Sequence, residues 1–218
     1  MKIALVGGTG DIGTGFAVRW SAAHEIIIGS RKSEKALESV KEVQAILGGA
    51  RNIWGTDNGG AIKAADIVVL CIPYEHLISV TSDIKASYSD QVVVSPVVPM
   101  SYNGKYFGYN PPPEGCAALQ AKALLPEGMR IVSAFHTICA AALHNRDLAL
   151  NGDALICGDD KESKDIVAGL ARAIKDLRPL DVGPLAVSAQ VESLTPMLLN
   201  VAKRNKLKNT GVKIVEEK

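Results

Sequence analysis

The sequence is poor in aromatic residues and carries almost no net charge. Phe, Trp and Tyr make up 5% of its 218 residues, and 24 basic residues nearly balance 23 acidic ones, which leaves a formal net charge of +1. Proteins that bind nucleic acids rely on basic surfaces and, for single strands, on aromatic side chains that stack on the bases. Both features are scarce, so we expect no nucleic-acid partner.

Long hydrophobic runs are also missing. Although 47% of the residues are hydrophobic, no apolar segment approaches the roughly 20 residues that a membrane-spanning helix needs. The first apolar segment starts at the third residue, which leaves no room ahead of it for the charged and apolar regions of a secretory signal. We therefore expect a soluble, cytoplasmic protein with no membrane partner.

Cysteine and histidine are sparse, with four residues of each. The cysteines include no C-x-x-C pair, and the histidines form no cluster at helical spacing. Zinc sites and disulfide frameworks depend on such spacings, so we expect no metal site and no disulfides. The apolar surroundings of Cys71 and Cys157 predict buried, reduced thiols.

The sequence does contain a strand, glycine turn, helix and strand within its first 31 residues, MKIALVGGTGDIGTGFAVRWSAAHEIIIGSR. In this context a G-x-G-x-x-G match predicts a dinucleotide site. Gly8 permits the tight turn, Gly10 leaves space for a pyrophosphate, and Gly13 lets the helix pack close to the strand. The helix N-terminus adds N–H groups and a partial positive charge. A tight turn that binds no ligand is the alternative interpretation.

The end of the second strand lacks the carboxylate with which NAD enzymes bond the ribose 2′-hydroxyl. Ser30, Arg31 and Lys35 stand at or just beyond this end. Hydroxyl, guanidinium and ammonium groups bind a 2′-phosphate, which a carboxylate would repel. We therefore predict a preference for NADP. The alternative is an exposed helix start, where these cations would oppose the helix dipole.

Further apolar segments alternate with helical patterns, which predicts an α/β fold: a Rossmann-type, doubly wound, mainly parallel sheet. We expect an NADP-binding domain over residues 1–152 and a small, mostly helical C-terminal domain over 153–218. Residues 101–115 are predicted to form an irregular surface loop. A final helix is expected from 187 to 207, bent near 195–196, with an apolar stripe that suits a core or a dimer surface. The charged tail from 206 to 218 is expected to fray.

Residues just past the ends of parallel strands face the ligand crevice of such a fold. Ile72, Pro73 and His76 follow one predicted strand and are expected beside the nucleotide, although His76 alternatively makes no contact in a helix first turn. Val98 lies in a proline-bounded loop that forms either a wall for a flat ring or a rigid crossover. His136 follows the strand predicted at 129–135, where it either donates a hydrogen bond to a bound ring or bonds the backbone.

Eight segments in fixed order resemble the F420-dependent NADP reductases of archaea and actinobacteria: KIALVGGTGDIGTGFAVRW, IIIGSRKSEKA, CIPYEHLI, VVVSPVVP, VSAFHTICAA, ICGDD, LRPLDVGPL and VESLTPMLLN. The resemblance covers nearly the whole chain. It implies reversible hydride transfer between NADP(H) and coenzyme F420, an 8-hydroxy-5-deazaflavin. It also implies a homo-oligomer, dimeric or tetrameric, in which the C-terminal domain closes the deazaflavin cleft and contributes to oligomerisation.

The same resemblance implies roles for individual residues. The implied nucleotide contacts are Thr9, Gly10, Asp11 and Ile12 at the pyrophosphate, Ser30, Arg31 and Lys35 at the 2′-phosphate, Ile72, Pro73 and His76 along the adenosine or nicotinamide half, and Val98 and Ala140 at the nicotinamide. The implied deazaflavin contacts are His136, Ile138 and the region of Leu207. Asp11 and Cys139 depart from the Asn and Pro expected in the family.

Hydride transfer between two flat rings requires close stacking, at about 3 to 3.5 Å, and exclusion of water. The apolar Ile72, Val98 and Ile138 suit this task, and His136 is predicted to orient the deazaflavin or stabilise charge on its ring. One alternative is an NADPH-dependent reductase of an imine, a keto acid or an ordinary flavin, although no clear Lys or Tyr proton donor follows the sheet. Another is a non-catalytic NADPH-sensing protein.

Overall fold

The computed structural model describes residues 1–49 and 52–217. Eight strands of this part form one sheet in the order β10-β9-β8-β5-β4-β1-β2-β3, and two more form a separate hairpin. The strands are β1 (Lys2–Val6), β2 (Glu25–Ser30), β3 (Ile53–Asp57), β4 (Ile67–Leu70), β5 (Val92–Ser95), β6 (Met100–Tyr102), β7 (Phe107–Tyr109), β8 (Arg130–Ser133), β9 (Gly152–Gly158) and β10 (Leu177–Gly183). The predicted mainly parallel Rossmann-type sheet is confirmed.

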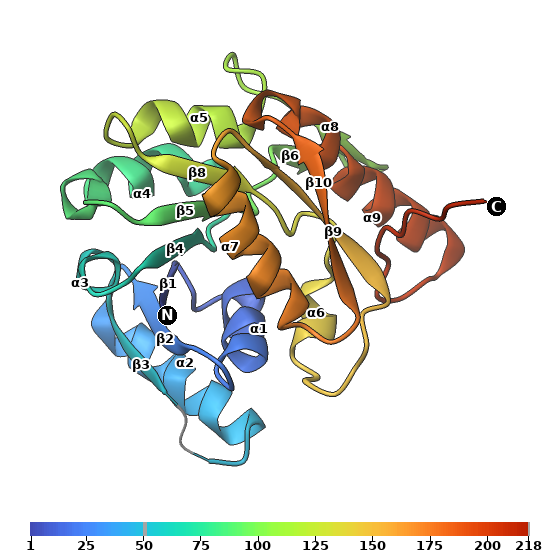
Figure 1. Cartoon of the computed structure of the whole chain (residues 1–218). Coiled ribbons are helices and arrows are strands. Elements are labelled where there is room, and N and C mark those ends of the chain that lie inside the picture. The colour runs from blue at the N-terminus through green and yellow to red at the C-terminus, as the bar shows by residue number, and fades with distance from the viewer. Residues whose placement is uncertain (50–51, 218) are drawn as a thin grey trace.

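Helices cover both faces of the sheet (Figure 1). The α-helices are α1 (Asp11–Trp20), α2 (Ser33–Ile46), α3 (Asn58–Lys63), α4 (Leu77–Ile84), α5 (Ala117–Leu124), α6 (Ala140–Leu143), α7 (Lys161–Arg172), α8 (Ser188–Glu192) and α9 (Leu194–Asn205). Short 3₁₀ helices are η1 (Tyr74–His76), η2 (Lys85–Ser87) and η3 (Leu185–Val187). None of the helices in the described ranges is both long and apolar enough to cross a membrane.

The apolar residues of β1 are shared between two cores. Ile3 and Leu5 pack in one cluster with residues of α1, α2 and α7. Ala4 and Val6 pack in a second cluster with residues of α3, α4 and α5. Because successive side chains of a strand point to opposite faces, a continuous apolar run is what a strand buried on both faces requires. Cys71 and Cys157 are buried free thiols, as predicted.

The sheet changes direction after β8. The strands from β3 to β8 pair in parallel, whereas β9 runs antiparallel to β8 and β10 runs parallel to β9. The boundary predicted after residue 152 therefore falls at the start of β9, directly after its first residue, and the same sheet continues across it. The reversal also brings the start of β9 to the edge where β8 ends, which is the edge that carries the functional residues.

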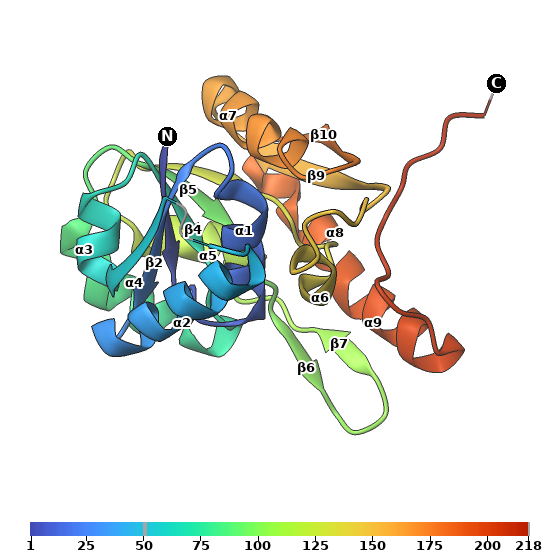
Figure 2. The same cartoon turned by 90° about the horizontal axis from the view of Figure 1, so that it is seen from below.

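The irregular loop predicted at 101–115 is partly wrong, because β6 and β7 form an antiparallel hairpin that extends from the body (Figure 2). Its turn is built by Asn103, whose side-chain oxygen accepts hydrogen bonds from the amides of Lys105 and Tyr106, at 3.0 Å each. Gly104 follows with φ of +89°. Asn-Gly is a strong hairpin signal, and the surrounding prolines and tyrosines obscured it.

The C-terminal segment also differs from the prediction. The expected final helix is broken into η3, α8 and α9, with the break at Ser193 just before the expected bend. The tail is held against β9 as far as Ile214. The amide of Asp153 in β9 donates to the carbonyl of Val212 (2.7 Å), and the amide of Ile214 donates to the Asp153 carboxylate (2.6 Å). Lys218, the last residue of the predicted tail, lies outside the described residues.

Candidate nucleotide site and adjoining cleft

The glycines of the β1–α1 turn have different surroundings. The amide of Gly8 donates to the carbonyls of Leu5 (3.0 Å) and Gly29 (2.9 Å), which fixes the turn between two strands. A Cβ atom on Gly13 would lie 2.4 Å from the Gly8 Cα, and a Cβ on Gly8 would lie 2.7 Å from the Leu5 Cβ, so each position requires glycine. A Cβ on Gly10 would meet nothing within 4 Å. The open space in front of Gly10 lies at the N-terminus of α1, where a phosphate would bind.

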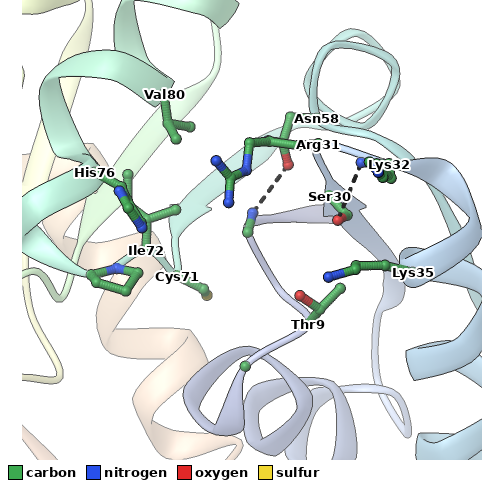
Figure 3. Close-up of a pocket in the computed structure, with 13 residues that line it drawn as sticks. Thr9, Ser30, Arg31, Lys32, Lys35, Asn58, Cys71, Ile72, His76 and Val80 are labelled. Carbon is green, nitrogen blue, oxygen red and sulfur yellow. Dashed lines mark hydrogen bonds between the residues drawn. The ribbon is translucent and has the colours of Figure 1, made fainter.

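This space belongs to a cavity of about 620 Å³ at the carboxyl ends of β1, β2 and β4 (Figure 3). The cavity brings together Thr9 and Gly10 from the turn, Ser30, Arg31 and Lys35 from the β2–α2 region, and Ile72, Pro73 and His76 after β4. It thus contains eight of the residues that sequence reasoning assigned to nucleotide binding. Its size and position suit one half or more of a dinucleotide.

The cations lie at one end of this cavity. Arg31, Lys32 and Lys35 line it together with the hydroxyl of Ser30, and no carboxylate is among the described residues that line it. Lys35 points from α2 toward Thr9, whereas Arg31 reaches into the cavity beside Asn58 (Figure 3). Ser30 is 6% exposed, and its oxygen accepts a hydrogen bond from the amide of Lys32 (3.4 Å). The arrangement can hold a phosphate that carries two negative charges.

Asn58 is a site residue that sequence reasoning missed. It is the first residue of α3, it is 5% exposed, and its side-chain oxygen accepts a hydrogen bond from the amide of Gly7 (3.1 Å). The contact joins the end of β3 to the glycine turn, 51 residues earlier in the chain. One usable signal is present in the sequence, the polar Asp57-Asn58-Gly59-Gly60 segment at the end of β3.

A second cleft, of about 420 Å³, adjoins the first cavity, and Ile72 and Pro73 line both. It holds four more of the predicted residues: Ile12, Val98, His136 and Ile138. Ile12 therefore lies at this cleft and does not line the nucleotide cavity. Most of the other lining residues are apolar or aromatic, such as Val97 and Phe135. Ile72 and Pro73 therefore form a wall between two adjoining cavities.

His136 is nearly buried at this cleft, with 5% of its surface exposed. Burial lowers the pKa of His136 to about 4, so the imidazole is neutral at neutral pH. Its Nε2 atom lies 3.5 Å from the Ser133 hydroxyl, and its Nδ1 atom is buried without a hydrogen-bond partner among the described residues. A buried polar atom without a partner costs free energy, which a bound ligand with a complementary group would recover.

Besides Gly8 and Gly13, which shape the turn, three predicted site residues line neither cavity. Asp11 is exposed at the start of α1 and does not line the nucleotide cavity. Ala140 begins α6, and its carbonyl would lie 3.4 Å from a Cβ on Gly15. Leu207 follows α9 and is 51% exposed. No group of three or more Cys, His, Asp or Glu side chains within residues 1–49 and 52–217 is placed to hold a metal ion.

The fold, the glycine turn and the cation-lined cavity are typical of NADP-dependent oxidoreductases. Residues 2–99 match the family model described as NADP oxidoreductase, coenzyme F420-dependent. The chain is 39% identical to the F420-dependent NADP reductase of Methanocaldococcus jannaschii, and the match covers 98% of both chains. It is 35% identical to the F420-dependent NADP reductase of Methanothermobacter thermautotrophicus, over 98% of this chain and 94% of that one. The chain belongs to the family of F420-dependent NADP reductases, which confirms the resemblance.

A solved structure supports the fold independently. The chain superposes on a crystal structure from Arthrobacter sp. FB24 with a TM-score of 0.84, over 99% of this chain and 100% of that one. The two sequences are 21% identical, so this likeness concerns the fold alone.

Proposed function

We propose that the protein catalyses reversible hydride transfer between NADP(H) and coenzyme F420. One observation carries the proposal: the cation-lined nucleotide cavity and the apolar cleft share the wall made by Ile72 and Pro73. A transfer between two flat rings needs adjoining sites, and a protein that only binds NADPH does not need the second one. The relatives that match over nearly their full length carry the same activity in their names.

The nucleotide cavity binds and orients NADP(H). The N–H groups at the start of α1 bond the pyrophosphate, and Thr9 and Gly10 line the space it occupies. Ser30, Arg31 and Lys35 hold the 2′-phosphate, which selects NADP over NAD. These residues would hold the adenosine half of NADP(H) and supply binding energy, and the shared wall of Ile72 and Pro73 would lie beside the nicotinamide half.

The second cleft binds the deazaflavin. The two cofactors supply the hydride chemistry when bound, with no protein nucleophile required. Val98 and Ile138 present apolar surface that excludes water from the stacked rings. His136 orients the deazaflavin through a neutral imidazole, which can donate a hydrogen bond from one nitrogen and accept one at the other.

The decisive experiment is a titration of the purified protein with oxidised F420 and NADPH. We expect F420 to bind in the absence of NADPH, and NADPH addition to bleach the absorbance of F420 at about 420 nm, the wavelength that names the coenzyme. Binding of NADPH without any binding of F420 would instead favour the NADPH-sensing alternative. Oxidation of NADPH by an imine or an ordinary flavin, with no response to F420, would favour the other reductases.

We further propose a homo-oligomeric, cytoplasmic enzyme with a C-terminal region, residues 153–218, that closes the cleft and contributes to association. Met197 and Val201 on α9 are 47% and 40% exposed, which suits a surface covered by a second copy. The buried free thiols suit a reducing compartment. Light scattering coupled to size-exclusion chromatography distinguishes a monomer from a dimer or tetramer.

A further inference from the structure

The ring of His136 makes few polar contacts of its own, and a hydrogen bond with the Ser95 backbone only partly offsets the effect of burial on its pKa. Its Nε2 atom lies 3.5 Å from the Ser133 hydroxyl, at the limit of a hydrogen bond, and its Nδ1 atom has no partner among the described residues. A histidine that bonds a ligand needs a fixed orientation before the ligand arrives. The backbone that carries the ring therefore also contributes to this orientation.

That backbone is in an unfavourable conformation. Phe135, directly before His136, has φ of +70°, in the left-handed region that a bulky side chain rarely adopts. Such a conformation persists only when its surroundings hold it. The Phe135 ring packs edge-on against the rings of Phe16 and Trp20, with centroid distances of 5.3 and 5.6 Å. The strained residue is thus anchored on one side by the core.

On the other side, the anchor is Thr195. Its hydroxyl donates a hydrogen bond to the backbone carbonyl of His136, at 2.9 Å, and the side chain itself lines the cleft. Thr195 lies in the first turn of α9 and reaches across 59 residues of sequence. Together with the aromatic cluster, it restrains both ends of the segment that sets the direction of the His136 ring.

Thr195 is itself held rigidly. Glu192, three residues earlier and fully buried, accepts hydrogen bonds from the amides of Ala117 (2.9 Å) and Ala118 (3.0 Å) at the start of α5. It also accepts one from the hydroxyl of Tyr109 in β7 (3.0 Å). These contacts fix the end of α8, directly before α9, to the body of the protein, so Thr195 offers a fixed point to the His136 carbonyl.

We propose that Thr195 is a positioning residue: its hydroxyl fixes the His136 backbone and thereby sets the imidazole orientation that binds the deazaflavin. The inference rests on the proposed function, because it assigns the ligand of His136 to F420. It also gives one way in which the C-terminal region contributes to the cleft, through the hydrogen bond of Thr195 to the β8–α6 connection.

The test compares Thr195→Val, which removes the hydroxyl and keeps the shape, with Thr195→Ser, which keeps the hydroxyl. Ser193→Ala is the matched control, because the Ser193 hydroxyl makes a bond of the same 2.9 Å length, to the Gln190 carbonyl, away from the cleft. The dissociation constants of oxidised F420 and of NADPH are measured separately, along with the thermal unfolding midpoint and the ring ¹⁵N shifts of His136 in the free protein.

We expect Thr195→Val to weaken F420 binding by roughly 3- to 10-fold, the range for loss of one hydrogen bond. NADPH binding changes less than about twofold, and the His136 ring shifts move. Thr195→Ser and Ser193→Ala resemble the wild type in all readouts.

Unchanged F420 binding and unchanged ring shifts in Thr195→Val would overturn the positioning role. So would equal weakening of both cofactors with a lower unfolding midpoint, because this indicates a general packing role. If the wild type itself binds no F420, the proposed function fails as well. If the wild type binds F420 and Thr195→Val binds it equally well, the positioning role alone fails.

Discussion

The two cavities are built in different ways. The residues that line the nucleotide cavity fall between Gly7 and Val80 and stand at the ends of neighbouring parallel strands. The residues of the second cleft extend from Ile12 to Thr195, and the loop that carries His136 is restrained by hydrogen bonds from distant segments. The first cavity thus depends on local turn chemistry, whereas the second depends on a few long-range polar contacts. Substitutions can test this distinction.

The largest effect is expected at the glycine turn. In Gly13→Ala, the added Cβ would lie 2.4 Å from the Gly8 Cα, and neither backbone can shift easily. We expect a loss of about 3 kcal/mol in the free energy of unfolding, typical of severe overpacking. Gly10→Ala is the control, because its Cβ meets nothing within 4 Å. It should cost less than about 1 kcal/mol and yet weaken NADPH binding, since the Cβ enters the phosphate space.

Urea unfolding and NADPH titration measure the two variants. Equal stability of the Gly13→Ala and Gly10→Ala proteins would contradict the tight packing inferred for the turn.

The next largest loss of stability is expected where Asp153 of β9 holds the C-terminal tail. Asp153, 2% exposed, accepts hydrogen bonds from Arg178 Nε (2.7 Å) and Nη2 (2.9 Å) and from the Ile214 amide. Hydrogen bonds from Arg178 lower the pKa of Asp153, so its contribution to stability is present near neutral pH and is lost as the pH falls through the lowered pKa. We expect Asp153→Asn to lower the free energy of unfolding by about 2 kcal/mol at pH 7.

The control is Asp165→Asn, which breaks the exposed Lys161–Asp165 pair. Exposed pairs contribute little, so a change below about 0.5 kcal/mol is expected there. Hydrogen exchange of residues 209–217 should accelerate in Asp153→Asn alone. Comparable losses in the two variants would mean that the tail is not fixed by Asp153.

A smaller effect is expected at the cation end of the nucleotide cavity. Arg31→Ala removes an exposed guanidinium that reaches into the cavity (Figure 3). We expect the Michaelis constant for NADPH to rise roughly 10- to 30-fold, because a charge-assisted hydrogen bond to the 2′-phosphate is lost. The constant for NADH, which has no 2′-phosphate, should change little. An unchanged ratio of the two constants in steady-state kinetics would refute the 2′-phosphate assignment.

The smallest effect is expected in the titration of His136. Because burial lowers its pKa to about 4, the ring ¹⁵N shifts should stay those of neutral imidazole from pH 7.5 to 5.5. Comparison with the spectrum of the His136→Gln variant, which lacks the His136 ring signals, assigns these signals. The imidazole takes up a proton on unfolding below its usual pKa, so it costs stability as the pH falls from about 6.5 toward 4. A midpoint near 6.5 for His136 in the folded protein would contradict its burial.

The same contrast explains what the sequence could predict. The glycine turn, the cations after β2 and the residues after β4 are adjacent in sequence to strand ends, so periodicity and turn chemistry locate them. Asn58 was missed because its role is a hydrogen bond with Gly7, and the two residues follow β3 and β1, which β2 separates. The order of the strands in the sheet brings Asn58 close to Gly7, and composition does not reveal this order.

The part of the chain from β9 to the C-terminal tail was predicted less well for a physical reason. The antiparallel entry of β9, the Glu192 contacts with α5 and the return of the tail to Asp153 are long-range polar contacts with no local pattern. Leu207 illustrates the consequence: the family resemblance implied a place at the deazaflavin, and in the structure it is half exposed and lines neither cavity. Its implied role stays a prediction.

The order of the lining residues along the chain has a consequence for biosynthesis. A ribosome has made every described residue that lines the nucleotide cavity once Val80 is in place, but the cleft still lacks Thr195 at that point. The nascent chain therefore carries every described residue that lines the nucleotide cavity more than a hundred residues before it carries the last residue that lines the cleft.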